Sequence, residues 1–261
     1  MKTQALKNIS LSFSSLFLFI LHIPFVFAKN KPFDEIRPVS LKIETTTAFD
    51  SSKTAENMET HNTAFLLYDS MHLNRMGLSQ QAFDYAIKGF NYLVQAGKLN
   101  NDKIISIVDF SLPSSKKRLF VIDLDEHKVI FCTYVAHGIN SGISSASKFS
   151  NKPESNKSSL GFFETLNTYT GSNGYSLRLE GLEKGINDNA GRRDIVIHGA
   201  PYVNEALIRL QGYIGRSWGC PAVPEKLHKP IINKIKNGTC LFIYSPDKNY
   251  LSHSPILHPA A

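Results

Sequence analysis

Short apolar runs, separated by connections rich in glycine, serine and asparagine, recur from residue 103 to residue 244. Each run is too short for a stable helix and is rich in β-branched or aromatic residues, so the pattern predicts strands. The runs lie at residues 104–110, 118–124, 128–135, 162–163, 176–179, 195–197 and 240–244. Many strands with few helices predict a mainly β fold, which we expect to be a mostly antiparallel β-sandwich or partial barrel with short helices.

Two local signals add detail to this fold. Asp125-Glu126-His127 joins two of the apolar runs and predicts a hairpin. A short helix is expected from Pro224 to Lys236, because proline suits the first turn of a helix and Gly238 follows its end.

The segment before the strands has a helical pattern. Residues 62–98 carry two amphipathic helices, and in the second Ser79 can cap the start while Gly97 can end it. Its apolar residues recur at helical spacing, at Ala82, Phe83, Ala86, Ile87, Phe90, Leu93 and Val94. We therefore expect residues 61–100 to form an N-terminal helical segment that packs on the β domain.

The two ends of the chain read differently from its middle. Residues 1–28 have a positive start, an apolar core and small residues before the end, which predicts a secretory signal cleaved after Ala28. An uncleaved membrane anchor is the alternative, although the apolar core is short for a span. Residues 29–60 are polar without a sustained period and predict a disordered linker, and residues 249–261 are expected to be a C-terminal tail. The protein is therefore expected to be exported, to the periplasm or the cell envelope.

Charge and motifs exclude several classes of partner. Removing residues 1–28 takes away two lysines and no acid, which lowers the net charge from +7 to +5. There is no basic block with interleaved aromatic residues, so nucleic acid is not expected as a partner. The histidines are scattered along the sequence without the paired spacing of metal ligands, and no phosphate-binding loop is present. Neither a metal nor another cofactor is therefore expected.

Three cysteines follow the predicted signal, and their surroundings differ. Cys132 and Cys240 lie in apolar strand patterns, where core filling is the first expectation and a disulfide between them the second. Cys220 lies in Arg216-Ser217-Trp218-Gly219-Cys220-Pro221, a sequence that suits neither a strand nor a helix. We therefore expect Cys220 to be an unpaired thiol on a turn.

A histidine follows the buried run 195–197 and precedes that turn, at His198-Gly199. A thiol and an imidazole are sufficient for nucleophilic acyl transfer, since the thiolate attacks a carbonyl while the histidine takes and returns the proton. Gly219 lets the backbone next to Cys220 approach a substrate, and the two N–H groups are expected to face a developing oxyanion. His137-Gly138 repeats the His-Gly pair after a strand, so His137 competes with His198 for the role of base.

A strand is followed by His198-Gly199, a spacer and then Ser217-Trp218-Gly219-Cys220-Pro221-Ala222. This arrangement resembles the catalytic motif of the murein L,D-transpeptidases (YkuD-type, Ser-Trp-Gly-Cys-Pro branch). The resemblance extends through residues 136–142, 158–165 and 176–200 and covers roughly residues 100–246. It implies an L,D-transpeptidase-like catalytic domain at residues 101–248 with the β-rich fold expected above. It also favours His198 over His137 as the base.

The resemblance implies acyl transfer on peptidoglycan stem peptides. Cys220 would attack the carbonyl between the L-centre of a diamino acid and a terminal D-Ala of a tetrapeptide, and His198 would protonate the departing amine. A second stem amine would resolve the thioester to a 3→3 crosslink, whereas water would make the protein an L,D-carboxypeptidase. Family members orient the histidine through its second nitrogen, for which Ser217 is the candidate here; its hydroxyl could equally bond the turn backbone.

This chain departs from the usual family pattern at two points. Trp218 stands where the family usually has His, and Pro221-Ala222-Val223 follow the cysteine where an Arg or Asn is usual. Another cation would then have to bind the substrate carboxylate, with Arg216, Arg192 and Arg193 as candidates. The residues expected to contact substrate are His137, Asn140, Arg192, Arg193, Tyr202, Arg216 and Trp218. The irregular stretch 138–160 is expected to border the cleft, with Ser158, Ser159 and Gly161 on one side.

Two other classes of function fit the same residues. A cysteine-dependent cell-wall peptidase or amidase would use the same pair for hydrolysis. A non-catalytic wall-binding protein would keep the fold and lose turnover, which the departures after Cys220 favour.

Overall fold

The computed structural model describes residues 63–259, so the expected signal at 1–28 and the expected linker at 29–60 lie outside the described residues. A helical stretch at 63–70 comes first. The elements that follow are α2 (Leu73–Met76), α3 (Gln80–Gln95), β1 (Ile104–Asp109), β2 (Leu119–Asp123), β3 (Lys128–Thr133), η1 (Ile139–Ser141), β4 (Gly161–Gly171), β5 (Gly174–Gly181), η2 (Gly191–Arg193), β6 (Val196–Ala200), α4 (Glu205–Gln211), β7 (Ala222–Pro224), α5 (His228–Ile235), β8 (Cys240–Tyr244) and α6 (Lys248–His253).

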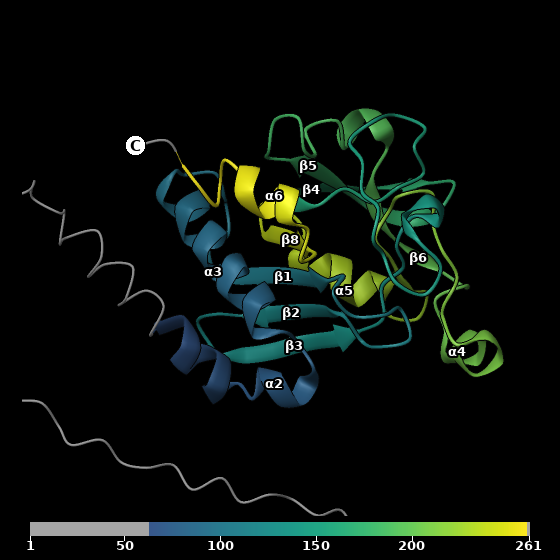
Figure 1. Cartoon of the computed structure of the whole chain (residues 1–261), viewed down its shortest axis with the longest axis horizontal. Coiled ribbons are helices and arrows are strands. Elements are labelled where there is room, and N and C mark those ends of the chain that lie inside the picture. Colours follow the sequence, from purple (N-terminus) through teal and green to yellow (C-terminus); the bar gives the residue numbers. More distant parts are fainter. Residues whose placement is uncertain (1–62, 260–261) are drawn as a thin grey trace, which may run out of the picture. The chain divides into compact units, whose positions relative to one another are not determined.

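All the strands belong to one sheet, in the order β3-β2-β1-β8-β4-β5-β6-β7 (Figure 1). Neighbours pair antiparallel except at two places, where β8 runs parallel to β1 and β7 runs parallel to β6. The chain that continues beyond β3 reaches the opposite edge, since the Ala136 N–H donates to the Ala222 carbonyl of β7 at 2.8 Å. The sheet is therefore a nearly closed barrel with short helices, which confirms the expected mainly β class.

The sheet order also decides the state of two cysteines. Cys132 lies in β3 and Cys240 in β8, with β2 and β1 between them. Three strand spacings separate residues by about 14 Å, whereas a disulfide needs Cα atoms within about 7 Å. Cys132, Cys220 and Cys240 are all free thiols.

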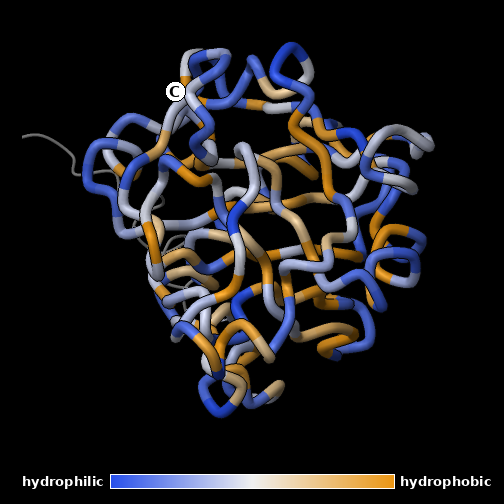
Figure 2. Tube along the Cα trace, turned by 90° about the vertical axis from the view of Figure 1, so that its right-hand side faces the viewer, coloured by the Kyte–Doolittle hydropathy of each residue, from blue (hydrophilic) through white to orange (hydrophobic). Residues whose placement is uncertain are grey.

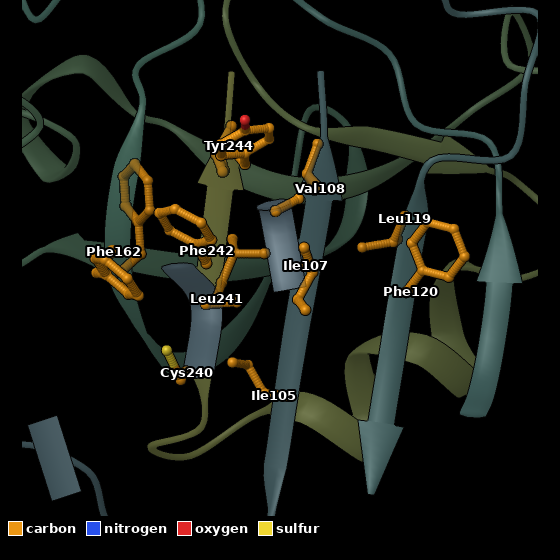
Figure 3. Packing of buried hydrophobic residues seen from close by; sticks show 14 of the residues in the cluster. Ile105, Ile107, Val108, Leu119, Phe120, Phe162, Cys240, Leu241, Phe242 and Tyr244 are labelled. Atoms are coloured by element: carbon orange, nitrogen blue, oxygen red, sulfur yellow. The ribbon is translucent and has the colours of Figure 1, made fainter. Parts of the chain in front are cut away.

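The core lies along the middle strands of the sheet. Every residue of β1 and β8 is buried, and because successive strand residues point to opposite faces, both faces are covered. Figure 3 shows aliphatic side chains of β1 and β2 beside the aromatic ones of β4 and β8. The rings of Phe162 and Phe242 stack there with centroids 4.2 Å apart. In Figure 2, hydrophobic segments run through the middle of the fold, while many of the outer loops, above all at the top, are hydrophilic.

The helix α3 covers β1 and β8, as its apolar stripe predicts. Ser79 is its N-cap, and its hydroxyl accepts a hydrogen bond from the Ala82 N–H at 3.0 Å. The ring of Phe162 lies where a Cβ on Gly89 would stand, so the glycine lets helix and sheet approach closely. The helical pattern of residues 62–98 and its capping residue are confirmed over the described part.

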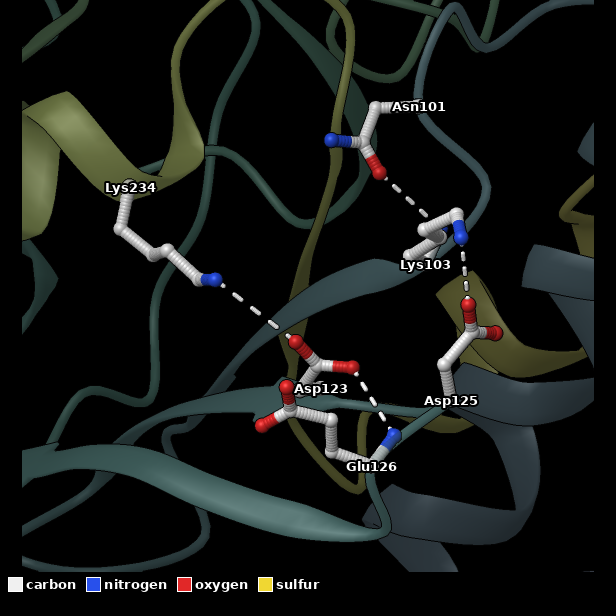
Figure 4. Close-up of polar contacts among 6 residues, drawn as sticks. All are labelled: Asn101, Lys103, Asp123, Asp125, Glu126 and Lys234. Carbon is white, nitrogen blue, oxygen red and sulfur yellow. Dashed lines mark hydrogen bonds and ion pairs between the residues drawn. The ribbon is translucent and has the colours of Figure 1, made fainter.

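The predicted hairpin between β2 and β3 is present, and polar contacts stabilise its turn (Figure 4). Asp123 accepts a hydrogen bond from the Glu126 N–H at 3.1 Å and forms an ion pair with Lys234 of α5 at 3.6 Å. Lys103, at the start of β1, pairs with Asp125 at 2.7 Å. These contacts connect the hairpin to its neighbours.

The end of the chain differs from the expected tail at residues 249–261. It contains α6, and Tyr250, Ile256 and Leu257 are buried in the core. Buried Glu183 holds this segment, because its carboxylate accepts hydrogen bonds from the Tyr250 hydroxyl at 3.1 Å and from Ser254. The sequence of residues 249–261 gives no signal for this packing, because its few apolar residues do not recur with a helical or strand period.

No helix within residues 63–259 combines the length and apolar character needed to cross a membrane.

Candidate active site

His198 lies in β6, between β5 and β7. It pairs with Ser176 on one side and with Ala222 on the other. Its side chain is 5% exposed, and Nδ1 lies 2.9 Å from the Gly199 carbonyl. A carbonyl oxygen only accepts, so in the neutral ring Nδ1 carries the proton and Nε2 has a free lone pair.

The turn that carries Cys220 is stabilised mainly by Ser217. Its hydroxyl donates to the Cys220 carbonyl at 2.6 Å and accepts from the Gly219 N–H at 3.1 Å. The backbone of Ser217 is itself held by the chain after β3, through bonds to the His137 carbonyl at 3.0 Å and the Ile139 N–H at 2.7 Å. Ser217 was expected either to orient His198 or to bond the backbone of the turn. Its hydroxyl bonds the turn backbone, and the Gly199 carbonyl is the partner of the His198 ring.

Gly219 is required by the shape of this turn. Its φ of 130° lies in a region that side-chain-bearing residues rarely adopt. A Cβ there would also stand 3.0 Å from the Lys157 carbonyl. Of the two amides expected at an oxyanion, the Gly219 N–H already donates to Ser217. The Cys220 N–H lies against its own thiol, where it opposes the rise of the thiol pKa.

The Cys220 thiol lies against the start of β6. It contacts the Asp194 carbonyl and accepts from the Val196 N–H, each at 3.5 Å. Asp194 has a left-handed backbone, φ 51°, which turns the chain between η2 and β6. Burial raises the pKa of the Cys220 thiol, and the Val196 N–H and the Arg193 cation oppose this rise.

Cys220 and His198 line one cavity of about 730 Å³. Tyr202, Arg192, Arg193, Arg216, Ser217 and Trp218 also line it, so the structure brings together most of the residues predicted for the site. Trp218 is 80% exposed at its mouth. The walls that sequence reasoning did not name are Pro153, Glu154, Asn156, Ser172, Asn173 and Asp194. Only the irregular composition of 138–160 was a signal for the first three.

Both partners of the pair are uncharged at rest. Burial lowers the pKa of His198, and the neighbouring His228 lowers it further. Burial, and the Cys220 thiolate where it forms, raise the pKa of Tyr202 to about 12, so its phenol stays protonated. A neutral thiol and a neutral imidazole therefore face the cavity, and proton transfer has to accompany nucleophilic attack.

The three arginines on the cavity differ in their contacts. Arg193 is half-buried and donates to four oxygens of the loop 150–159. Arg216 donates to the Gly142 carbonyl at 3.2 Å. Arg192 is exposed.

His137 does not contact this cavity, contrary to the expectation that it binds substrate. It is fully buried, and its Nδ1 accepts from the Arg118 guanidinium at 2.7 Å while Nε2 faces the Gly142 carbonyl at 3.3 Å. Burial and the Arg118 charge lower its pKa to about 4, so it is neutral. His137 orders the following loop, a role that the His-Gly pattern alone could not separate from that of a base.

Asn140 is also absent from the cavity wall. Its side chain donates to the Ser155 carbonyl at 3.0 Å, which fastens the loop 150–159. Ser158 joins both parts of the site, because its hydroxyl accepts from the Gly138 N–H at 3.0 Å and donates to the Gly219 carbonyl at 3.3 Å. Within residues 63–259, no three His, Cys, Asp or Glu side chains gather as metal ligands.

The fold and the cavity define a mainly β protein with a cysteine and a histidine at one cleft. A family model described as the L,D-transpeptidase catalytic domain matches residues 74–244, well over half of the chain. The protein therefore belongs to the L,D-transpeptidase catalytic domain family, whose members modify peptidoglycan.

Solved structures of L,D-transpeptidases are similar to the chain at low identity. An L,D-transpeptidase from Mycobacterium smegmatis is 13% identical over 55% of this chain and 59% of its own, with a TM-score of 0.34. L,D-transpeptidase 3 from Mycobacterium tuberculosis is 12% identical over 55% of this chain and 61% of its own, with a TM-score of 0.34. A mutant L,D-transpeptidase from Enterococcus faecium is 16% identical over 54% of this chain and 50% of its own, with a TM-score of 0.33.

The matched part thus spans less than two thirds of the solved chains. Membership of the family is shown by the family model that matches residues 74–244. No curated protein sequence matches the chain significantly.

Proposed function

We propose that the protein is an exported peptidoglycan L,D-transpeptidase or L,D-carboxypeptidase that acts on tetrapeptide stems through a Cys220 thioester. The observation that carries the proposal is a free Cys220 thiol and a tautomer-fixed His198 on the same cavity, in a chain of the L,D-transpeptidase family. The proposed signal at residues 1–28 would deliver it to the periplasm or the cell envelope.

The resting protonation states suggest the order of events. His198 Nε2 takes the thiol proton as sulfur attacks the carbonyl before the terminal D-Ala, because neither group is charged beforehand. The Cys220 N–H is proposed as a donor to the new oxyanion. The tetrahedral intermediate collapses as the carbon–nitrogen bond breaks, and His198 returns the proton to the departing D-Ala amine.

The thioester is then resolved by a nucleophile from the open side of the cavity. A stem amine gives a 3→3 crosslink, and water gives a tripeptide; His198 takes the proton of either nucleophile and returns it to sulfur. The side chains of Arg192, Arg216, Trp218 and Tyr202 are proposed to hold the stem, since all four line the cavity.

The test is muropeptide analysis after the purified full chain is incubated with tetrapeptide-rich cell wall. We expect D-Ala release with tripeptide or 3→3 dimers, and no turnover by Cys220→Ser or His198→Ala. Cleavage without D-Ala release would favour a cysteine-dependent wall peptidase or amidase. Wall binding by Cys220→Ala, with no turnover by the unmutated protein, would favour a non-catalytic binder.

A second test uses a carbapenem, whose strained carbonyl mimics the donor bond. Intact-mass analysis should find one adduct, on Cys220. A thiol reagent that labels Cys220 under conditions where the carbapenem does not would contradict the proposal.

A further inference from the structure

Arg193 lies between two parts of the site that are distant in sequence. On one side its guanidinium donates to the loop 150–159, at Ser150 O (2.8 Å), Ser155 Oγ (3.3 Å), Lys157 O (2.6 Å) and Ser159 Oγ. On the other side it reaches the turn before Cys220, because its Nη2 is 3.4 Å from where a Cβ on Gly219 would stand. One side chain therefore contacts both the loop and the nucleophile's turn.

The hydrogen bonds of Arg193 leave little capacity for a ligand. Nη1 serves Ser150 and Ser159, while Nη2 serves Ser155 and Lys157. A guanidinium has two N–H groups on each terminal nitrogen and one on Nε, so all four terminal hydrogens are engaged. The two-pronged geometry with which arginine holds a carboxylate is therefore already occupied by the protein itself.

The loop that Arg193 fastens forms one wall of the cavity. Pro153, Glu154 and Asn156 line that wall. Glu154 and Asn156 both have left-handed backbones, φ 58° and 53°, which are uncommon for residues with side chains and persist only where surrounding contacts hold them. Arg193 and Asn140 supply those contacts from outside the loop.

We propose that Arg193 is a positioning residue, which fastens the loop 150–159 as a wall of the cavity and keeps a cation beside Cys220, and that it does not bind the substrate carboxylate. Arg192, its exposed neighbour on the same cavity, is assigned that task, with Arg216 beside the turn. The assignment of Arg192 rests on the proposed function, whereas the role of Arg193 in loop and thiol does not.

The charged and titratable groups around Cys220 determine how removal of the Arg193 cation would affect the thiol. Arg193 favours the thiolate, the Asp194 carboxylate opposes it, and His198 and Tyr202 share the cavity in their neutral forms. Removing the Arg193 cation leaves only the Val196 and Cys220 N–H groups to oppose burial and Asp194, so the thiolate becomes scarcer at a given pH.

The experiment separates the charge from the hydrogen bonds. In the full chain with Cys132→Ser, which leaves Cys220 as the accessible thiol, the rate of alkylation by iodoacetamide is measured against pH, and limited proteolysis reports nicking within 150–159. For Arg193→Gln we expect alkylation at pH 7 to slow severalfold, because the thiolate becomes scarcer, and nicking to appear. Arg193→Lys keeps the charge, so its alkylation stays near that of the parent while nicking appears.

A double variant, Ser155→Ala with Ser159→Ala, removes acceptors without touching the cation. It should show nicking with unchanged alkylation, and it keeps the test decisive if Arg193→Gln does not fold. The proposal is overturned if loosening the loop and slowing alkylation cannot be separated in this way, or if Arg193→Gln alters neither.

The substrate assignment is tested by Arg192→Gln, for which we expect a raised KM for tetrapeptide with alkylation and nicking unchanged. If Arg193→Lys raises the KM without nicking, then Arg193, and not Arg192, binds the substrate carboxylate. Alkylation and proteolysis need no peptidoglycan. If the unmutated protein shows no turnover, the proposed function fails while the role of Arg193 in loop and thiol is still decided.

Discussion

Replacing Glu183 with alanine should be among the most destabilising single changes outside the cavity. The carboxylate is fully buried and accepts hydrogen bonds from the Phe162 N–H at 2.8 Å, the Tyr250 hydroxyl at 3.1 Å and Ser254. Alanine leaves three buried donors without a partner. A hydrogen bond to a charged group contributes about 1.5–3 kcal/mol, and the carboxylate's own desolvation cost disappears with it, so we expect a net loss of about 3–5 kcal/mol.

Glu183→Gln is the matched variant, because an amide of the same shape keeps an acceptor for Phe162 and Tyr250 and offers N–H to Ser254. Its loss should stay near 1 kcal/mol or below. Burial raises the pKa of Glu183, so the folded protein binds a proton more tightly than the unfolded chain. Glu183 alone therefore makes the free energy of unfolding fall as pH rises above about 4.5, a contribution that the glutamine variant lacks.

Urea unfolding followed by circular dichroism measures all three proteins, with exposed Glu180→Ala as the surface control. In thermal unfolding, a loss of 1 kcal/mol lowers the melting temperature by about 2–4 °C, so the melting temperature of the alanine variant should fall by roughly 10 °C. The reasoning is refuted if Glu183→Ala loses less than about 1 kcal/mol, or if the glutamine variant is destabilised as much as the alanine variant.

Three other predictions concern the site and its support. Gly219→Ala should keep the fold but lower alkylation of Cys220 and turnover by an order of magnitude or more, since φ 130° and the nearby Lys157 carbonyl exclude a Cβ; normal kinetics would contradict this. Arg118→Met should cost about 3–5 kcal/mol in urea unfolding, because the Leu112 and Val135 carbonyls and His137 lose their donor; a neutral result would mean water replaces it. His137, with its pKa lowered to about 4, should make the free energy of unfolding fall by about 3 kcal/mol as pH drops from about 6.5 to 4, because the unfolded chain takes up a proton first; a His137→Gln variant with the same slope would exclude this source.

The regular elements followed well from local pattern. Short apolar runs rich in β-branched and aromatic residues predicted β1, β2, β3 and β8, and Ser79 with its apolar stripe predicted α3. The short strand β7 and the helix α4 were missed, because three residues carry no period and the helix buries none of its residues. The long β4–β5 hairpin was predicted only at two apolar segments, residues 162–163 at the start of β4 and 176–179 within β5, since its tip is exposed and polar.

The site divides in the same way. Their flanking residues predicted that Cys220 and His198 lie at one site, and both line the same cavity. The roles of His137, Asn140 and Arg193 could not be distinguished by spacing. All three are polar residues in irregular segments, and only their burial and contacts in the folded chain show what each one holds. That separation depends on residues far away in sequence, such as Arg118 for His137.

By itself, the order of amino acids determined the secondary structure of the central strands, the fold class and the turn that carries Cys220, because φ/ψ preferences and hydrophobic periodicity act over a few residues. Tertiary structure alone decided that β8 inserts beside β1, that Cys132 and Cys240 stay apart, and that the three arginines near the thiol have different surroundings. The physical reason is that pairing, burial and electrostatic environment depend on distances between segments separated by tens of residues, and those distances exist only once the sheet has closed.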